Sequence, residues 1–290
     1  MNLIQPKRIG IVCKGRDEDV FVLDKLLEPI EERVEIIFDE ATAHKLQKRG
    51  MKIEEMNVDL LICIGGDGTI LRTLHALKSP TPVLGINMGA IGFLAEVQPE
   101  NSVSTLTNLL EEGFEVERKE RLSVVINGKT AKMPYAMNEV VVITSKPGKM
   151  LHFTIFLDGE ELERLRADGV IFATPTGSTA YAMSAGGPIV DPKVNATIIV
   201  PIAPFKLAAR PTVVDINSEI SLELLEMKDA ELVIDGQFYR AIGREERISI
   251  TRGEPALFVK VWDKHFLKLR DKLRSEEEKE NAKNIGTEVE

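Results

Sequence analysis

The stretch VDLLICIGGDGTILRTLHAL, residues 58–77, decides the fold. Its first seven residues are almost all apolar, which is typical of a parallel-sheet strand buried on both faces. After the glycines of residues 65–68, Leu71, Leu74 and Leu77 recur at helical spacing. We therefore predict a strand at Val58–Ile64, a glycine-rich turn and a helix at Ile70–Leu77, which together form one unit of an α/β fold.

The same alternation of apolar runs and amphipathic segments extends to both sides of this unit. It predicts an N-terminal α/β domain with a parallel sheet over residues 1–117. Its further strands are expected at Ile9–Cys13, Val34–Phe38 and Pro82–Ile86. Its further helices are expected at Glu18–Glu31, Thr42–Arg49 and Asn101–Glu112.

From Arg118 onward the pattern changes to short strands joined by tight turns. The dipeptides Asn127-Gly128, Asp158-Gly159 and Asp235-Gly236 are strong hairpin signals. We predict a β-rich, mostly antiparallel domain over residues 118–256, with strands at 138–144, 169–173, 197–201, 212–216, 219–225 and 247–251. A last strand is expected at 257–262, a helix at 264–273 and a flexible charged tail at 276–290.

Length and charge limit the classes of function. A chain of 290 residues is long enough for about two domains. Lys plus Arg is 37 and Asp plus Glu is 46, so the net charge is −9. This balance argues against binding to nucleic acid or to an acidic membrane. An anionic ligand must then be held locally, by backbone amides, a few basic side chains or a metal.

Cysteine usage and hydropathy indicate a cellular location. Cys13 and Cys63 both lie in apolar runs, which favours buried free thiols over a disulfide. No apolar run approaches the ~18 residues of a membrane helix, and no signal segment is recognisable at the N-terminus. We expect a soluble protein of the cytoplasm, with no membrane and no nucleic-acid partner.

The motif Gly65-Gly66-Asp67-Gly68-Thr69 is the first candidate for chemistry. It lies at the carboxyl end of a buried strand, where open α/β sheets bind ligands. Asp67 could act as a general base toward a hydroxyl or as an outer-sphere metal contact, and Arg72 lies one turn further on. The alternative is a tight turn whose Asp caps the helix.

Two further motifs follow strands or begin them. Residues 87–94, NMGAIGFL, suit backbone turns near the same sheet edge, with Phe93 and Leu94 packed in the core. Asn138 and Glu139 could grip a ribose or an adenine edge, since the carboxylate accepts and the amide both donates and accepts. Without further context, a polar start to a strand is the better explanation of this pair.

The longest motif, residues 166–188, combines a strand with a loop of small and hydroxyl-bearing residues. Tyr181 could stack on a base, and Asp168 could accept from a ribose or a ring amine. The length of the loop favours binding over a purely structural turn. Asp235-Gly236-Gln237 needs no explanation beyond a hairpin turn, and Lys149 and Arg166 matter only if the ligand carries phosphate.

Together these residues resemble the NAD kinase family over roughly Arg8 to Leu269. GGDGT alone also occurs in lipid kinases, but its combination with the Asn-Glu pair, ATPTGSTAY at 173–181, SAGGP at 184–188 and DGQ at 235–237 is specific. Two departures are Phe205-Lys206, where the family often has His-Ser, and Ala167, where Gly or Ser is common.

The resemblance implies an active site in a cleft between the two domains, and a segment 257–275 that returns to the first domain. It implies phosphoryl transfer from ATP, or from polyphosphate, to the adenosine 2′-hydroxyl of NAD, giving NADP, with a divalent metal such as magnesium. It also implies a homodimer or homotetramer. Donor, metal, oligomeric state, the choice between NAD and NADH and the effect of Phe205-Lys206 stay open.

The resemblance also assigns residues. Asp67 matches the family's proton acceptor. The implied nucleotide contacts are Gly66, Gly68, Thr69, Arg72, Asn138, Glu139, Lys149, Arg166, Asp168, Thr176, Thr179, Ala180, Tyr181, Ala182, Met183, Ser184 and Gln237.

Three other functions remain as alternatives. A lipid or other small-molecule kinase would share GGDGT but would need an apolar acceptor channel, which the polar 173–181 loop disfavours. A non-catalytic NAD(H) or NADP sensor is disfavoured by the intact Asp67. A scaffold without a ligand would leave the small-residue loops without a purpose.

Overall fold

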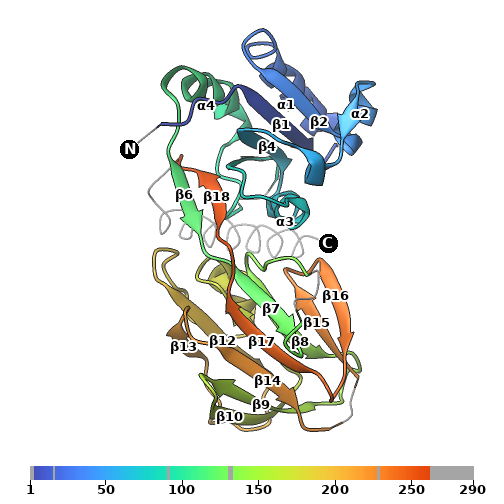
Figure 1. Ribbon diagram of the computed structural model, residues 1–290, viewed down its shortest axis with the longest axis vertical. Helices are drawn as coiled ribbons and strands as arrows, with labels where there is room; N and C mark the ends of the chain where they lie inside the picture. The colour runs from blue at the N-terminus through green and yellow to red at the C-terminus, as the bar shows by residue number, and fades with distance from the viewer. Residues whose placement is uncertain (1–2, 16, 90–91, 130–132, 227–228, 262–290) are drawn as a thin grey trace, which may run out of the picture. The chain divides into compact units, whose positions relative to one another are not determined.

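The computed structural model describes residues 3–15, 17–89, 92–129, 133–226 and 229–261, and the chain divides into two compact units. Of the described residues, unit 1 comprises those within 3–73, 81–117 and 258–261. Unit 2 comprises residues 74–80 and 118–257 (Figure 1). The predicted helix at 264–273 and the predicted tail at 276–290 lie outside the described residues.

The sheet of unit 1 has the strand order β3-β2-β1-β4-β5-β18-β6. Its strands are β1 (Arg8–Cys13), β2 (Glu35–Asp39), β3 (Gly50–Met51), β4 (Leu60–Gly65), β5 (Val83–Asn87), β6 (Val116–Lys119) and β18 (Ala256–Val259). The pairs from β3 through to β18 are parallel, and Figure 1 shows β18 and β6 side by side. The predicted parallel α/β arrangement is confirmed.

The helices of this part of the chain are α1 (Asp17–Leu27), α2 (Glu40–Leu46), α3 (Asp67–Ala76) and α4 (Pro99–Glu112), with a short 3-10 turn, η1, at Ile53–Glu55. Alternate residues of β1 and β4 pack with α1 and α4 in one core that includes Ile11, Leu26, Ile62 and Leu106. All six residues of β4 are buried, as its apolar sequence predicts.

All four helices begin earlier than the sequence predicts, α1 at Asp17 rather than Glu18 and α4 at Pro99 rather than Asn101, and the shifts of α2 and α3 bear on the site. α2 starts at Glu40 rather than Thr42, because the Asp39 carboxylate accepts from Ala41 N and Thr42 N, both at 3.2 Å. α3 starts at Asp67 rather than Ile70, so the motif aspartate is its first residue. The periodicity of leucines located the body of α3 but could not mark its first turn, which is made of Asp, Gly and Thr.

Unit 2 contains two antiparallel sheets. A five-stranded sheet has the order β10-β9-β14-β17-β7 and a six-stranded sheet the order β13-β12-β11-β8-β15-β16. The strands are β7 (Leu122–Ile126), β8 (Glu139–Thr144), β9 (Leu151–Leu157), β10 (Glu160–Ala167), β11 (Gly169–Ala173), β12 (Ala196–Ile202), β13 (Thr212–Asp215), β14 (Ile220–Leu224), β15 (Ala230–Ile234), β16 (Phe238–Ile242) and β17 (Arg247–Arg252). The predicted antiparallel, β-rich architecture is confirmed.

The three predicted hairpin dipeptides have the backbone that their sequence requires. Both residues of each have positive φ: 51° and 67° at 127–128, 51° and 87° at 158–159, and 49° and 63° at 235–236. Two successive positive φ values characterise the type I′ turn, which Asn-Gly and Asp-Gly favour.

The six-stranded sheet is buried on both faces, which explains its continuous apolar runs. Val140 and Val142 face a core shared with the five-stranded sheet. Val141, on the opposite face, packs with Ile171 and Ala182. Ala182 belongs to the short helix α5 (Tyr181–Ser184), which follows the 3-10 turn η2 (Thr176–Thr179). The small-residue loop therefore covers the second face of this sheet.

Candidate functional site

Asp67 lies at the junction of β4 and α3, and its carboxylate is bound by a second loop. Oδ2 accepts a hydrogen bond from Phe93 N at 2.8 Å. Oδ1 accepts from Leu94 N at 3.0 Å and from Ala95 N at 3.1 Å. The carboxylate thus fixes the NMGAIGFL segment, a role that neither the helix-capping reading nor the general-base reading of the sequence included.

The geometry leaves part of the Asp67 carboxylate available. A carboxylate has about four lone-pair sites, and three amides occupy three of them. Among the described residues no donor is seen at the fourth, on Oδ2, which can therefore accept from a ligand hydroxyl, and the residue is only half-buried. An oriented carboxylate with one open acceptor position can take a proton from an alcohol.

The two glycine-rich segments adjoin at the carboxyl edge of the parallel sheet. Met88 N donates to Gly65 O at 3.1 Å, and Asn87 Oδ1 accepts from Gly89 N at 3.2 Å. Phe93 and Leu94 are 8% and 1% exposed, so their prediction as core residues is confirmed. The two buried apolar side chains therefore anchor the C-terminal end of this segment in the core.

Gly92 allows the close approach of this loop to Asp67. A Cβ at position 92 would lie 2.9 Å from Asp67 Cγ, and nearer still to Oδ1. Such a separation is not tolerated between carbon atoms, so the carboxylate or the loop would have to move. At Gly89 in the same segment, a Cβ would have no neighbour within 4 Å.

We predict that Gly92→Ala lowers kcat by about 10-fold to 100-fold, because it displaces the Asp67 carboxylate from its three amides. Gly89→Ala is the matched control, since it adds the same methyl group to the same segment in open space. Steady-state kinetics of the two variants, with their unfolding midpoints, make the comparison. Equal kcat values for the two variants would contradict the role assigned to Gly92.

The other predicted residues of this segment differ in availability. Thr69 is 3% exposed, and its side chain occupies the space that a Gly65 side chain would need. Gly66 borders open space, and Gly68 and Arg72 are exposed. Gly66, Gly68 and Arg72 are thus available to a ligand, whereas the Thr69 side chain supports the turn.

In unit 2, the loop of residues 174–177 packs directly on the backbone of Asn138. Thr174 N donates to Asn138 O at 2.8 Å, and Thr174 Oγ1 donates to Met137 O at 2.7 Å. Gly177 N in turn donates to Thr174 Oγ1 at 2.9 Å. A Cβ on Gly177 would lie 2.7 Å from Asn138 Cα, so only glycine permits this packing. The structure thus brings two of the predicted motifs together.

Glu139 is an unusual carboxyl group. It is 6% exposed, and within the described part of the chain its Oε2 has no hydrogen-bond partner. Burial, and next the nearby Asp235 carboxylate, raise the pKa of Glu139 from 4.5 to about 8, against the opposing effect of a hydrogen bond from the Tyr181 backbone. At neutral pH the group is mainly protonated, so it can donate as well as accept.

We predict that the contribution of Glu139 to the free energy of unfolding falls as pH rises from about 4.5 to about 8. The slope of this contribution is at most about 1.4 kcal/mol per pH unit. In that range the unfolded chain has released the Glu139 proton, whereas the folded chain retains it. Glu139→Gln stays neutral in both states and should lack this contribution. Denaturant unfolding at several pH values measures the slope, with Glu160→Gln, which changes an exposed residue, as the control. An unchanged slope in Glu139→Gln would contradict the prediction.

Sequence reasoning missed the role of Asp235. Its turn conformation satisfied the Asp-Gly signal, so no further function was assigned to it. Its side chain is fully buried, and it accepts from Met137 N, Asn138 N and Glu139 N at 2.8, 2.8 and 3.0 Å. His75 Nε2 lies 2.8 Å from Oδ2 of the same carboxylate.

The remaining predicted residues of the 168–184 region fall into two groups. Thr176, Thr179 and Ala182 are buried, and Ala180 and Met183 are partly buried. Tyr181, at 41% exposure, and Ser184 are open to solvent and to a ligand. Asp168 is half-buried, and its backbone donates to Ile202 O and accepts from Thr144 N.

Lys149, Arg166 and Gln237 are exposed. Lys149 N donates to Lys146 O in the β8–β9 turn. Arg166, on β10, holds its guanidinium carbon 5.6 Å from the ring centre of Phe205. In the described part of the chain no contact joins Lys149 or Arg166 to the Asn138–Glu139 backbone, so their assignment as nucleotide contacts stays a prediction.

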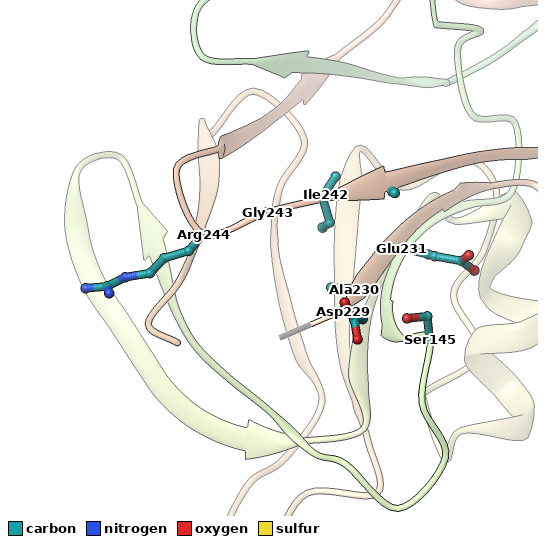
Figure 2. Close-up of a pocket in the computed structure, with 8 residues that line it drawn as sticks. Ser145, Asp229, Ala230, Glu231, Ile242, Gly243 and Arg244 are labelled. Carbon is teal, nitrogen blue, oxygen red and sulfur yellow. The ribbon is translucent and has the colours of Figure 1, made fainter. Parts of the chain in front are cut away.

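A cavity of about 410 Å³ lies at the other end of the strands that carry this site. Its lining includes Ser145, Asp229, Glu231, Ile242 and Arg244. Figure 2 shows the Arg244 side chain extending away from Asp229 and Ser145. Ala230 pairs with Thr144 and Ile234 pairs with Val140, so the cavity and the Asn138–Glu139 segment lie at opposite ends of β8. This cavity is therefore separate from the predicted nucleotide contacts.

Two features of the described residues bear on metal binding and on membrane insertion. No group of three or more His, Cys, Asp or Glu side chains among them is arranged to hold a metal ion. No helix among them is long and apolar enough to cross a membrane. Cys13 and Cys63 are free and buried, as predicted.

Comparison with protein families gives two matches that together cover most of the chain. Residues 9–114 match the ATP-NAD kinase N-terminal domain. Residues 137–261 match the ATP-NAD kinase C-terminal domain. The boundary between the matches falls where the parallel sheet gives way to the antiparallel sheets.

Individual proteins agree with these matches. The chain is 44% identical to an NAD kinase of Methanosarcina mazei, over 90% of this chain and 91% of that protein. It is 46% identical to an NAD kinase of Methanothermobacter thermautotrophicus, over 92% and 96%. Among solved structures, an NAD kinase from Archaeoglobus fulgidus in complex with ATP has a TM-score of 0.78 at 36% identity, covering 92% of this chain and 99% of that one. A yeast NADH kinase complexed with NADH shares the fold, with a TM-score of 0.81 at 24% identity, over 92% and 86%.

Proposed function

The chain belongs to the NAD kinase family and is an NAD-phosphorylating kinase, and we propose that it transfers a phosphoryl group from ATP to the adenosine 2′-hydroxyl of NAD, giving NADP. The observation that carries this proposal is the Asp67 carboxylate. It is fixed by three backbone amides at the carboxyl edge of a parallel sheet, yet keeps one acceptor position on Oδ2.

In this proposal Asp67 accepts the proton of the 2′-hydroxyl as the oxygen attacks the γ-phosphorus of ATP, the bond from that phosphorus to the β,γ-bridging oxygen breaks and ADP leaves. A ribose hydroxyl is a poor nucleophile at neutral pH, and a positioned carboxylate raises the rate by about 10² to 10⁴. The remaining acceleration comes from alignment of donor and acceptor and from neutralisation of phosphate charge. Backbone amides of the Gly66–Gly68 turn, at the start of α3, suit that second task.

We assign recognition of NAD to Asn138 and Glu139. Glu139, protonated at neutral pH, can donate its proton to an acceptor on the nucleotide, while Asn138 supplies a half-buried amide. Tyr181 is exposed enough to stack on a base, and Arg72 is an exposed cation on α3. Asp168, Ser184 and Gln237 are further polar candidates at exposed or half-buried positions.

We further propose that a divalent metal, magnesium first, accompanies the phosphoryl donor. Magnesium is usually held by substrate phosphates and only one or two carboxylates. The described residues fit that mode, because no cluster of three ligating side chains is found among them and the open position of Asp67 is assigned to the 2′-hydroxyl, so the metal would be held chiefly by the phosphates. When bound, the metal would neutralise phosphate charge in a protein whose net charge is −9.

The same proposal includes two properties of the whole molecule. We expect a homodimer or homotetramer, which is supported by the exposed apolar side chains of Phe205 and Leu207 at 68% and 91% exposure. We expect the cytoplasm as its location, because free buried cysteines suit a reducing compartment.

We predict that the purified protein forms NADP from NAD and ATP with magnesium, and that EDTA abolishes this turnover until magnesium is restored. Chromatographic detection of the 2′-phosphorylated product, with NADH and polyphosphate tested in parallel, decides acceptor and donor. EDTA should leave the unfolding midpoint unchanged, because the metal enters with the phosphates. Turnover that persists in EDTA would contradict the metal's role, and phosphorylation of a lipid but not of NAD would contradict the function.

We predict that Asp67→Asn lowers kcat by about 10² to 10⁴, because an amide cannot take the proton. The amide oxygen can still accept from Leu94 and Ala95, so the NAD dissociation constant should change by less than about tenfold. Asp59→Asn is the matched control, since Asp59 Oδ2 also accepts from two backbone amides, Lys7 N and Arg8 N. Wild-type turnover in Asp67→Asn would rule out the general-base role.

A further inference from the structure

Asp235 is a buried carboxylate whose acceptor positions are all used. Its side chain is 0% exposed. Oδ1 accepts from Asn138 N and Glu139 N, and Oδ2 accepts from Met137 N and pairs with His75 Nε2. Four hydrogen bonds fill the roughly four lone-pair sites of a carboxylate. Asp235 therefore has no position left for a ligand, and its effect must act through the groups that it holds.

The groups that it holds are three consecutive backbone amides that end at the first residue of β8. Asp235 N also donates to Glu139 O at 3.0 Å, so the β15–β16 turn binds both the backbone N–H and the backbone carbonyl of Glu139. On the other side, Asn138 O is held by Thr174 N, and Gly177 packs against Asn138 Cα. Hydrogen bonds thus fix both the backbone N–H and the backbone carbonyl of Asn138. Neither of these bonds involves its side chain.

Three of the four donors to Asp235 are backbone amides. The fourth, His75, donates through its side chain, which a substitution can remove while the backbone amides stay in place. Its side chain is 12% exposed, and it lies in the last turn of α3, in the segment 74–80 that groups with unit 2. Because an ionised carboxylate can only accept, Nε2 is the donor in this pair. Removal of the imidazole would leave a fully buried carboxylate oxygen short of a donor, which permits it to shift.

We propose that Asp235, oriented by His75, is a positioning residue for NAD: it aims the backbone from which Asn138 and Glu139 contact the nucleotide. This inference rests on the proposed function, in which Asn138 and Glu139 bind NAD. Asp235 also bears on the chemistry of Glu139, because its negative charge favours the protonated form of that neighbour. The Asp-Gly-Gln segment then forms a turn and also contributes to NAD affinity, because its Asp235 positions Asn138 and Glu139.

The test compares two replacements of His75 in the full-length protein. His75→Phe removes the donor at similar volume, and His75→Gln keeps an N–H donor. We expect the NAD dissociation constant, measured by calorimetry, to rise about 10-fold to 100-fold in His75→Phe and less than about threefold in His75→Gln. KM for NAD should follow the dissociation constant, while kcat and KM for ATP stay within about threefold.

The matched control is His152→Phe, which removes a partly exposed histidine 3.3 Å from Glu226 and should leave NAD affinity unchanged. A role confined to stability would lower the unfolding midpoint of His75→Phe without moving NAD affinity, and that result would overturn the proposal. If His75→Phe does not fold, Asp235→Asn provides the same comparison, because its amide group cannot accept from every amide that the carboxylate holds.

Asn138→Ala separates this inference from the function on which it rests. If Asn138→Ala binds NAD as the wild type does, the assignment of Asn138 fails. If Asn138→Ala loses affinity while His75→Phe does not, only the positioning role fails. When both lose affinity, the double variant should lose less than the sum of the two single losses, because the Asn138 contact that His75 supports is already absent in Asn138→Ala. Additive losses would show that His75 acts elsewhere.

Discussion

Both predicted parts of the active site depend on the same interaction, a carboxylate that receives three consecutive backbone N–H groups. Asp67 gathers the amides of residues 93–95, and Asp235 gathers those of residues 137–139. Hydrogen bonds to an ionised acceptor are stronger than neutral ones, and a buried amide without an acceptor is costly. Each carboxylate therefore fixes the backbone conformation of the three residues whose amides it binds.

The two carboxylates differ in what they leave available, and that difference separates their roles. Asp67 is half-buried and keeps one acceptor position, so it can meet a substrate hydroxyl. Asp235 is fully buried, and all of its acceptor positions are used. His75 occupies its fourth position, whereas the fourth position of Asp67 has no such donor among the described residues. One arrangement of amides thus supports the proposed general base in unit 1 and the proposed positioning residue in unit 2.

The fold was largely predictable, and so were the motifs, because both depend on local rules. The apolar run of β4, the leucine spacing of α3 and the positive-φ Asp-Gly turns each follow from residue type and spacing alone. Element ends were less predictable. The first turn of α3 contains no apolar period, and α2 begins at a cap made by Asp39, the last residue of β2, which the sequence analysis assigned to no element.

The contacts that build the site could not be predicted from sequence, because they join residues far apart in the chain. Nothing near Asp235 indicates that it would meet residues 137–139, or that His75 would approach it across 160 positions. The Asp-Gly hairpin signal hid this role, since it accounted fully for the local conformation. A turn explains why Asp235 adopts a positive φ, but any Asn-Gly pair would do so equally well. The acidic side chain is needed because only a carboxylate can accept from all four donors at once. The presence of Asp rather than Asn at position 235 is therefore explained by these hydrogen bonds and not by the turn.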